Sequence, residues 1–340
     1  MPASEPELTQ LLARLISGGA FPGAVVAAAT PTRRLDAHAG RLSVAADALA
    51  VEPDTRYDLA SVTKVYVSSA VVRLVEDGTL ALEDPAGRFL PELPDDKREL
   101  TLRQLLAHTS GLPPGSALAP RPTDPQALRR RVVDLPLAGP PGRQVIYSSP
   151  GYLLLGWILE RVSGAGLDVV LRHLVLDPLG CHRTGFSPPA AERPAIGATE
   201  LLPGGEVVQG RVHDETSGIL GGVTGHAGLF GPATEVLHFG EALLRGDDLG
   251  VSRSRNLLFG DLTGGLDPRR SAAFVIDDPV FATFEATTFS HTGFTGTSLC
   301  LVPERDLAVV LLSNRINPTR DNDLIGPART AVHRRVAELI

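Results

Sequence analysis

The stretch DLASVTKVYV (residues 58–67) places a serine and a lysine three residues apart, at the start of a mostly apolar segment. Residues 65–77 predict a helix closed by Gly78, with Ser61 in its first turn. The i, i+3 spacing puts Ser61 and Lys64 on one helix face, within reach of each other. The Ser61 N–H then belongs to the unsatisfied first turn, at the positive end of the helix dipole, where an oxyanion could be held.

Lysine is rare in this chain, which uses it only at positions 64 and 97 among its 32 basic residues. A serine hydroxyl becomes a strong nucleophile when a neighbouring base takes its proton. Lysine can act as that base when its ammonium, with an ordinary pKa of about 10.4, is desolvated, whereas arginine cannot. Lys97, in the loop PDDKREL, is expected on the surface. A serine that only caps the helix is the alternative interpretation of Ser61.

Composition indicates a soluble globular protein of one or two domains, with 340 residues, 43% hydrophobic and 21% charged. The net charge of −7 and the scattered arginines argue against nucleic-acid binding. Residues 1–19 have the spacing of an amphipathic helix and lack the features of a signal peptide. No apolar run reaches the length of a membrane span. A cytoplasmic location without membrane association is therefore expected. Cys181 and Cys300 are expected to be reduced, buried thiols.

Strand patterns lie at both ends of the chain and helix patterns in the middle. Residues 21–29 and 34–40, and then 285–291, 297–302 and 307–313, predict short strands. A final helix follows, in which apolar residues recur every four positions. Residues 101–108 and 151–162 predict helices, the second closed by Gly164. Proline-rich loops at 113–125 and 136–141 separate these helices.

This order of elements predicts an α+β fold with two parts. Residues 1–75 and 241–340 would combine into a largely antiparallel sheet flanked by the terminal helices, and residues 76–240 would form an inserted, mostly helical domain. A cleft between the two is the expected active site.

A second stretch, QVIYSSPGYLLLG (residues 144–156), places Tyr147 on a loop just before a helix. With both stretches considered, the chain resembles the serine β-lactamase and penicillin-binding protein family. It is most similar to the class C β-lactamases and their esterase relatives. The family's motifs appear in order as Ser61–Lys64, Tyr147–Ser149 and His291–Gly293. TLRQLLAHTSGL (101–112), GGVTGHAGLF (221–230) and RDLAVVLLSNR (305–315) also fit, so the resemblance runs from about residue 21 to residue 315.

The resemblance implies a mechanism as well as the fold. Ser61 would attack a carbonyl and become acylated, while Lys64 and Tyr147 share the general-base and general-acid work. Which of the two takes the first proton stays open. The family pattern makes the backbone N–H groups of Ser61 and Phe294 the oxyanion donors.

Two departures from the family pattern concern the substrate. His291 stands where many members carry a lysine, so the fixed positive charge that faces a substrate carboxylate is missing. Ser149 replaces the more usual asparagine and loses an amide that can both donate and accept. These changes favour a small ester or amide. The candidate substrate-binding residues are Ser149, His226, His291, Thr292 and Gly293.

Two alternative functions stay open beside the small-ester hydrolase. A β-lactamase or D-amino-acid peptidase of the DD-carboxypeptidase kind is one, and a penicillin-binding sensor that hydrolyses nothing is the other. The expected partner is a small ester, amide or β-lactam. We expect no cofactor and no metal, because neither His226 nor the pair His213–Asp214 shows metal-ligand spacing. The sequence does not determine the oligomeric state.

Overall fold

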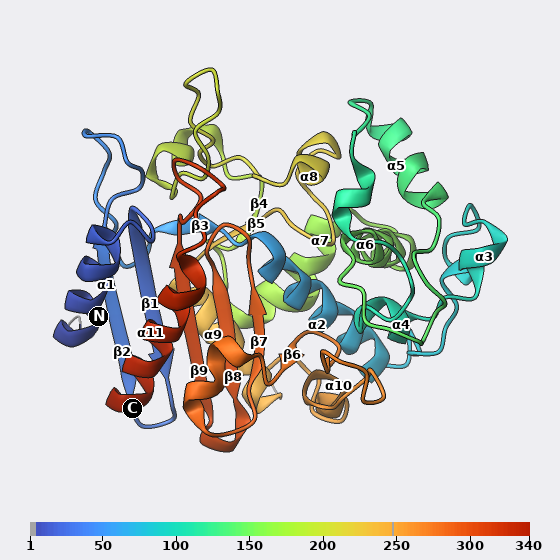
Figure 1. The fold of residues 1–340 in the computed structure, drawn as a ribbon. Helices are drawn as coiled ribbons and strands as arrows, with labels where there is room; N and C mark the ends of the chain where they lie inside the picture. Colours follow the sequence, from blue (N-terminus) through green and yellow to red (C-terminus); the bar gives the residue numbers. More distant parts are fainter. Residues whose placement is uncertain (1–4, 247) are drawn as a thin grey trace.

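The computed structural model describes residues 5–246 and 248–340. Its main sheet has six strands in the order β2-β1-β9-β8-β7-β6, and every neighbouring pair is antiparallel. Strands from the two ends of the chain meet inside this sheet, where β1 pairs with β9 and Ala24 lies opposite Ser313 (Figure 1). The strands are β1 (Gly23–Ala29), β2 (Arg34–Gly40), β6 (Val275–Ile276), β7 (Phe289–Thr292), β8 (Ser298–Val302) and β9 (Leu307–Ser313). The predicted α+β class, with a largely antiparallel sheet, is confirmed.

The interior strand β1 is apolar throughout because both of its faces are covered. Alternate side chains of a strand point to opposite faces. Val25, Ala27 and Ala29 join the core that contains helix α9 (Ala233–Arg245). Ala24 and its alternate neighbours join a second core, under helices α1 (Pro6–Ser17) and α11 (Ile325–Leu339). The sheet is therefore a middle layer between the terminal helices and α9.

Helices dominate the middle of the chain, as predicted. The remaining helices are α2 (Thr63–Glu76), α3 (Asp95–Arg98), α4 (Leu102–Leu106), α5 (Pro125–Asp134), α6 (Ser149–Ser163), α7 (Leu167–Leu171), α8 (Glu215–Ile219) and α10 (Arg255–Phe259). Of these, α2 packs against α6 and α7, and α4 packs against α6. Short 3₁₀ turns occupy Ala60–Val62, Ala86–Arg88, Gly115–Leu118, Asp177–Leu179, Ala190–Ala195, Pro279–Phe284 and Pro303–Arg305, and Arg172–Leu176 is a π turn.

A second, three-stranded sheet was not predicted. It has the order β3-β5-β4, formed by β3 (Arg56–Asp58), β4 (Gly185–Phe186) and β5 (Leu229–Pro232). Strands of this length are too short to show an alternating pattern. The sheet connects the segment just before Ser61 to residues more than a hundred positions later, and Leu59 N–H donates to the Leu229 carbonyl at 2.9 Å.

Several local predictions differ from the structure. The strand expected at 285–291 begins only at Phe289, because Glu285, which ends the 3₁₀ turn Pro279–Phe284, has a left-handed backbone with φ of 49°. Lys97 is wrongly predicted as a surface residue: its side chain is 2% exposed and its Nζ lies 3.1 Å from Asp96. The predicted domain boundary at 240/241 falls inside α9, so we propose to move it to about residue 233, where α9 begins.

Cys181 and Cys300 are free and buried, as predicted. Within the described residues, no helix combines the length and the apolar character that crossing a bilayer requires.

Candidate active site

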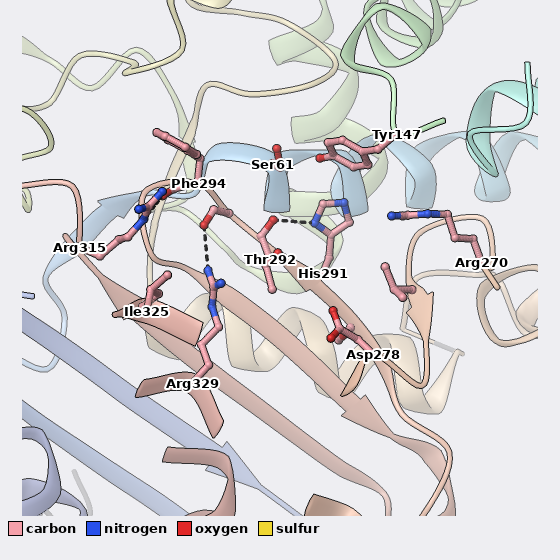
Figure 2. Close-up of a pocket in the computed structure, with 13 residues that line it drawn as sticks. Ser61, Tyr147, Arg270, Asp278, His291, Thr292, Phe294, Arg315, Ile325 and Arg329 are labelled. Atoms are coloured by element: carbon pink, nitrogen blue, oxygen red, sulfur yellow. Dashed lines mark hydrogen bonds between the residues drawn. The ribbon is translucent and has the colours of Figure 1, made fainter. Parts of the chain in front are cut away.

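Ser61 lies in the 3₁₀ turn Ala60–Val62, which leads directly into α2. The preceding residue, Ala60, has a left-handed backbone with φ of 47°. Such a conformation is costly for a residue other than glycine and is held only by surrounding contacts. One of these contacts is a hydrogen bond of 2.8 Å from the Ala60 N–H to the buried Asp58 carboxylate. The sharp turn places the Ser61 side chain at the wall of a cavity (Figure 2).

Lys64 is fully buried one helical turn after Ser61. Its Nζ lies 3.1 Å from Ser61 Oγ and 2.9 Å from the His226 carbonyl oxygen. The same nitrogen is 5.1 Å from the centre of the Tyr147 ring. The predicted serine–lysine pair is therefore in direct hydrogen-bond contact, and a proton can pass between the two groups.

Tyr147 is positioned by the start of α6. The next residue, Ser148, caps this helix by accepting the Gly151 N–H at 3.2 Å, and its hydroxyl donates to the Pro113 carbonyl at 2.8 Å. The Ser148 N–H donates to His108 Nδ1 at 3.0 Å, and the His108 ring lies 4.6 Å from the Tyr147 ring. Burial holds the pKa of His108 well below its ordinary value, so a neutral imidazole accepts this hydrogen bond.

The opposite wall is the end of β7, which approaches the Ser61 turn very closely. A Cβ on Gly293 would lie 2.0 Å from Thr297 Oγ1 and 2.7 Å from the Leu59 carbonyl oxygen. Thr297 Oγ1 donates to that same carbonyl at 3.0 Å, and Thr295 Oγ1 donates to the Asp58 carbonyl at 2.7 Å. The turn after β7 is thus bound to the two residues that precede the Ser61 turn.

His291, at the end of β7, is an uncharged histidine. Burial, with the nearby charges of Lys64 and Arg270, holds the pKa of His291 well below its ordinary value. Its Nδ1 lies 3.1 Å from the Thr292 carbonyl oxygen, which can only accept, so Nδ1 carries the proton and Nε2 has a free lone pair. Nε2 has no hydrogen-bond partner among the described residues. His291 therefore supplies no positive charge to the cavity, and its Nε2 is buried.

The cavity has a volume of about 400 Å³ and brings together most of the predicted site residues. Figure 2 shows Tyr147 and His291 beside Ser61, with Phe294 on the other side. Its lining residues include Ser61, Tyr147, His291, Thr292, Gly293 and Phe294.

Two predicted substrate-binding side chains lie elsewhere. Ser149 begins α6 near Gly115 and is not among the lining residues. The His226 ring is buried, with Nε2 2.9 Å from Asp214 Oδ1 and Nδ1 3.1 Å from Thr224 Oγ1. Although burial raises the pKa of Asp214, the His226 ring holds that pKa well below its ordinary value. His226 therefore fixes its own loop, and only its carbonyl reaches the site, through Lys64.

The structure adds charged residues that the sequence did not indicate. Arg270, Asp278, Arg315 and Arg329 also line the cavity. Arg270 is 8% exposed, its guanidinium carbon lies 5.3 Å from the centre of the Tyr147 ring, and its Nε has no hydrogen-bond partner within the described part of the chain. No motif marks these arginines among the many others. In residues 5–246 and 248–340, no cluster of three or more His, Cys, Asp or Glu side chains could hold a metal ion.

The fold and the serine–lysine pair define a serine hydrolase. The chain belongs to the Beta-lactamase family, whose model matches residues 8–333. A putative D-alanyl-D-alanine carboxypeptidase from Salmonella agona is 29% identical over 326 residues, which cover 81% of this chain and 72% of that protein. A protein of the same description from Salmonella typhimurium is 30% identical, with the same coverage.

Solved structures share the fold over nearly the whole chain. EstCE1, a hydrolase with promiscuous acyltransferase activity, has a TM-score of 0.79 and 22% identity, covering 96% of this chain and 97% of its own. A class C β-lactamase from Rhodobacter sphaeroides has a TM-score of 0.73 and 20% identity, covering 99% of this chain and all (100%) of its own. The predicted family and its β-lactamase-like fold are confirmed.

Proposed function

We propose that this serine hydrolase cleaves small esters and amides through an acyl-enzyme formed on Ser61. The observation that carries this proposal is the 3.1 Å contact between Lys64 Nζ and Ser61 Oγ, beside a cavity that Ser61, Tyr147 and Phe294 line. A nucleophile within hydrogen-bond reach of a base, facing a backbone N–H, is the arrangement that acyl transfer requires.

In the proposed reaction, Ser61 Oγ forms a bond to the substrate carbonyl carbon and gives its proton to Lys64 or Tyr147. The carbonyl π electrons move to the oxygen, which the N–H groups of Ser61 and Phe294 hold. The bond to the leaving group then breaks, and the leaving alcohol or amine takes up the proton. Water next attacks the acyl-enzyme in the same way, which releases the carboxylic acid and restores the Ser61 hydroxyl.

The polarity of the β7 wall supports a small ester as the preferred substrate. His291 is neutral and supplies no cation to the cavity. Ser149, in the position of the usual asparagine, is not among the residues that line the cavity. Neither residue therefore offers the charge or the amide that would favour binding of a penicillin with an acylamido side chain.

Kinetics with p-nitrophenyl acetate and with nitrocefin test this proposal. We expect a burst of p-nitrophenol followed by steady turnover, with both abolished in Ser61→Ala, and nitrocefin hydrolysis much slower than ester hydrolysis. Faster nitrocefin hydrolysis would indicate a β-lactamase instead. Stoichiometric acylation of Ser61 without release, detected by mass spectrometry after treatment with a penicillin, would indicate the non-hydrolysing sensor.

A carboxypeptidase acting on D-alanyl peptides is a second candidate, favoured by Arg270. Arg270 lines the cavity beside Tyr147, and guanidinium groups bind carboxylates in a bidentate manner. It could supply the positive charge that His291 lacks. The Salmonella relatives described as putative D-alanyl-D-alanine carboxypeptidases agree with this candidate.

Arg270→Met tests the second candidate. If it holds, the variant should raise KM for an N-acyl-D-Ala-D-Ala peptide about 10-fold or more and leave KM for p-nitrophenyl acetate unchanged, because only the peptide carries a carboxylate. Arg269→Met is the control, since Arg269 instead pairs with Asp277 on the surface, at 2.6 Å. Failure of the wild-type protein to release D-alanine would refute this candidate and leave the esterase proposal standing.

A further inference from the structure

The peptide group between Gly293 and Phe294 has a strong donor fixed on its carbonyl. Arg329 Nη2 donates to the Gly293 oxygen at 2.9 Å, and the Gly296 N–H donates to the same oxygen at 3.1 Å. Figure 2 shows Arg329 on one side of this turn and Ser61 on the other. The peptide is trans, so its C=O and N–H point in opposite directions. A donor held on the carbonyl therefore turns the Phe294 N–H toward the Ser61 side.

The Phe294 N–H itself is available. It has no hydrogen-bond partner among the residues that the structure describes. The next carbonyl along the chain, that of Phe294, accepts Arg315 Nε at 2.7 Å, so the peptide groups on both sides of Phe294 are anchored by arginines. A donor with a fixed direction and no competing acceptor is what a preorganised oxyanion site needs.

Arg329 is an unusual residue for bracing a turn. It comes from α11, its side chain is 8% exposed, and Nη2 also donates to the Thr297 carbonyl at 2.9 Å. These hydrogen bonds go to backbone carbonyls rather than to a carboxylate. Burial, together with the nearby Arg315, lowers the pKa of Arg329 to about 10, so the group remains a cation at neutral pH. Burying a cation is costly, and neutral donors would suffice to fix two carbonyls.

A cation on the carbonyl changes the N–H at the other end of the same peptide group. Charge-assisted hydrogen bonds are shorter and stronger than neutral ones, and they polarise the groups that accept them. Electron density drawn toward the Gly293 oxygen leaves the Phe294 N–H a better donor. The effect is largest when the bound oxygen carries a full negative charge, so it stabilises the tetrahedral intermediate more than the substrate.

We infer that Arg329 is a positioning residue for the oxyanion hole, which aims and polarises the Phe294 N–H through the Gly293 carbonyl. This inference rests on the proposed function, because it takes Phe294 as an oxyanion donor. It assigns a part in the reaction to the C-terminal helix, which contributes no motif to the site.

Two variants of Arg329 test the inference, Arg329→Met and Arg329→Lys. The control is Arg334→Met, which changes an exposed residue of the same helix. With p-nitrophenyl acetate we expect Arg329→Met to lower kcat by about 10- to 100-fold, with little change in KM. Complete loss of an oxyanion donor costs roughly 10²–10³-fold in kcat, so the expected loss does not exceed that cost. Affinity for a phenylboronic acid, whose tetrahedral adduct on Ser61 resembles the intermediate, should fall by a similar factor. Arg329→Lys should recover part of both losses, and Arg334→Met should match the wild-type protein.

Infrared difference spectra separate this role from a purely structural one. When the acyl-enzyme is formed with a ¹³C-labelled carbonyl, weaker hydrogen bonding in Arg329→Met should move the acyl carbonyl band to higher wavenumber. A folded Arg329→Met protein with an unshifted band, and with kcat and boronate affinity within twofold of wild type, would overturn the inference. If that variant does not fold, Arg329→Gln replaces it under the same criteria. Absence of Ser61-dependent turnover in the wild-type protein would instead refute the proposed function.

Discussion

At the scale of single residues, Lys64 differs from the arginines around the cavity because it can release its proton. Its Nζ is in contact with the Ser61 hydroxyl and with one backbone carbonyl. Arginine remains protonated in proteins, and its planar guanidinium is larger than an ammonium group. The proposed chemistry therefore depends on lysine at position 64 rather than on positive charge alone.

The Lys64→Arg variant should lose activity although it keeps the charge. We expect kcat/KM for p-nitrophenyl acetate to fall by about 10²–10⁴-fold, the usual contribution of a general base. The same substitution at the only other lysine, Lys97→Arg, is the control and should leave kcat unchanged. Near wild-type kcat/KM in a folded Lys64→Arg protein would show that Lys64 is not a base.

Residue spacing made Ser61 and Lys64 predictable and the family resemblance added Tyr147, but neither indicated the arginines of the cavity. Ser61 and Lys64 lie within one helical turn, so their contact follows from local geometry. Arg270 and Arg329 come from segments that reach the site only through the tertiary fold. Burial of Lys97 also escaped prediction, since a charged loop sequence normally indicates an exposed residue.

At the scale of elements, the start of α6 holds Tyr147 in the site. Ser148→Ala removes the side chain that caps this helix and also removes the hydrogen bond to Pro113. We expect a loss of about 1 kcal/mol in the free energy of unfolding, and a decrease in kcat of about 10-fold because Tyr147 loses its fixed position. Chemical denaturation and ester kinetics measure the two effects.

Ser163→Ala, at the other end of α6, is the matched control for this prediction. Among the described residues, its hydroxyl bonds to Leu159, Glu160 and Ala165 at the end of this helix, with the Leu159 carbonyl at 2.8 Å. We expect it to leave kcat unchanged. A Ser148→Ala protein with lower stability but wild-type kcat would mean that the cap does not position Tyr147.

The end of β7 depends on a glycine for its approach to the Ser61 turn. In Gly293→Ala, the new Cβ would meet Thr297 Oγ1 and the Leu59 carbonyl, so the strand end must move away from Ser61. We expect kcat/KM to fall by about 10²-fold or more, since small displacements of catalytic groups are that costly. Gly326→Ala, where a Cβ meets nothing within 4 Å, is the control and should keep full activity. Equal activity in both variants would contradict the assigned role of β7.

At the scale of the whole molecule, the layer of terminal helices makes stability depend on pH through a buried histidine. His333, on α11, packs against the edges of Phe281 and Phe284, and its Nδ1 lies 2.7 Å from the Arg329 carbonyl oxygen. Burial lowers the pKa of His333 from 6.5 to about 4. Between these values the unfolded chain binds a proton that the folded chain does not, so the free energy of unfolding falls as the pH is lowered.

We expect His333 alone to make the protein about 2 kcal/mol less stable at pH 5 than at pH 7.5, with His108 and His291 acting in the same direction. Urea denaturation of His333→Gln should show a pH dependence smaller by about that amount, whatever its absolute stability. His173→Gln makes the same substitution on an exposed ring and is the control. An unchanged pH dependence in His333→Gln would exclude this residue as the cause.

The sequence by itself determined the local features of this protein. The serine–lysine spacing, the helix that follows Tyr147 and the apolar strands at both ends of the chain depend on neighbouring residues, whose geometry is set by helix and strand periodicity. The antiparallel sheet followed from these patterns, and the family from a resemblance carried by the three motifs in order. They were visible without knowledge of any distant contact.

Only the tertiary structure decided which distant groups meet at the site. The pairing of β1 with β9, the small β3-β5-β4 sheet and the hydrogen bond from Arg329 to Gly293 each join segments separated in sequence. Such contacts form because packing buries apolar surface on both faces of the sheet at once, and no local pattern encodes the partner. For the same reason, the charges of the cavity and the direction of the Phe294 N–H became visible only in the folded molecule.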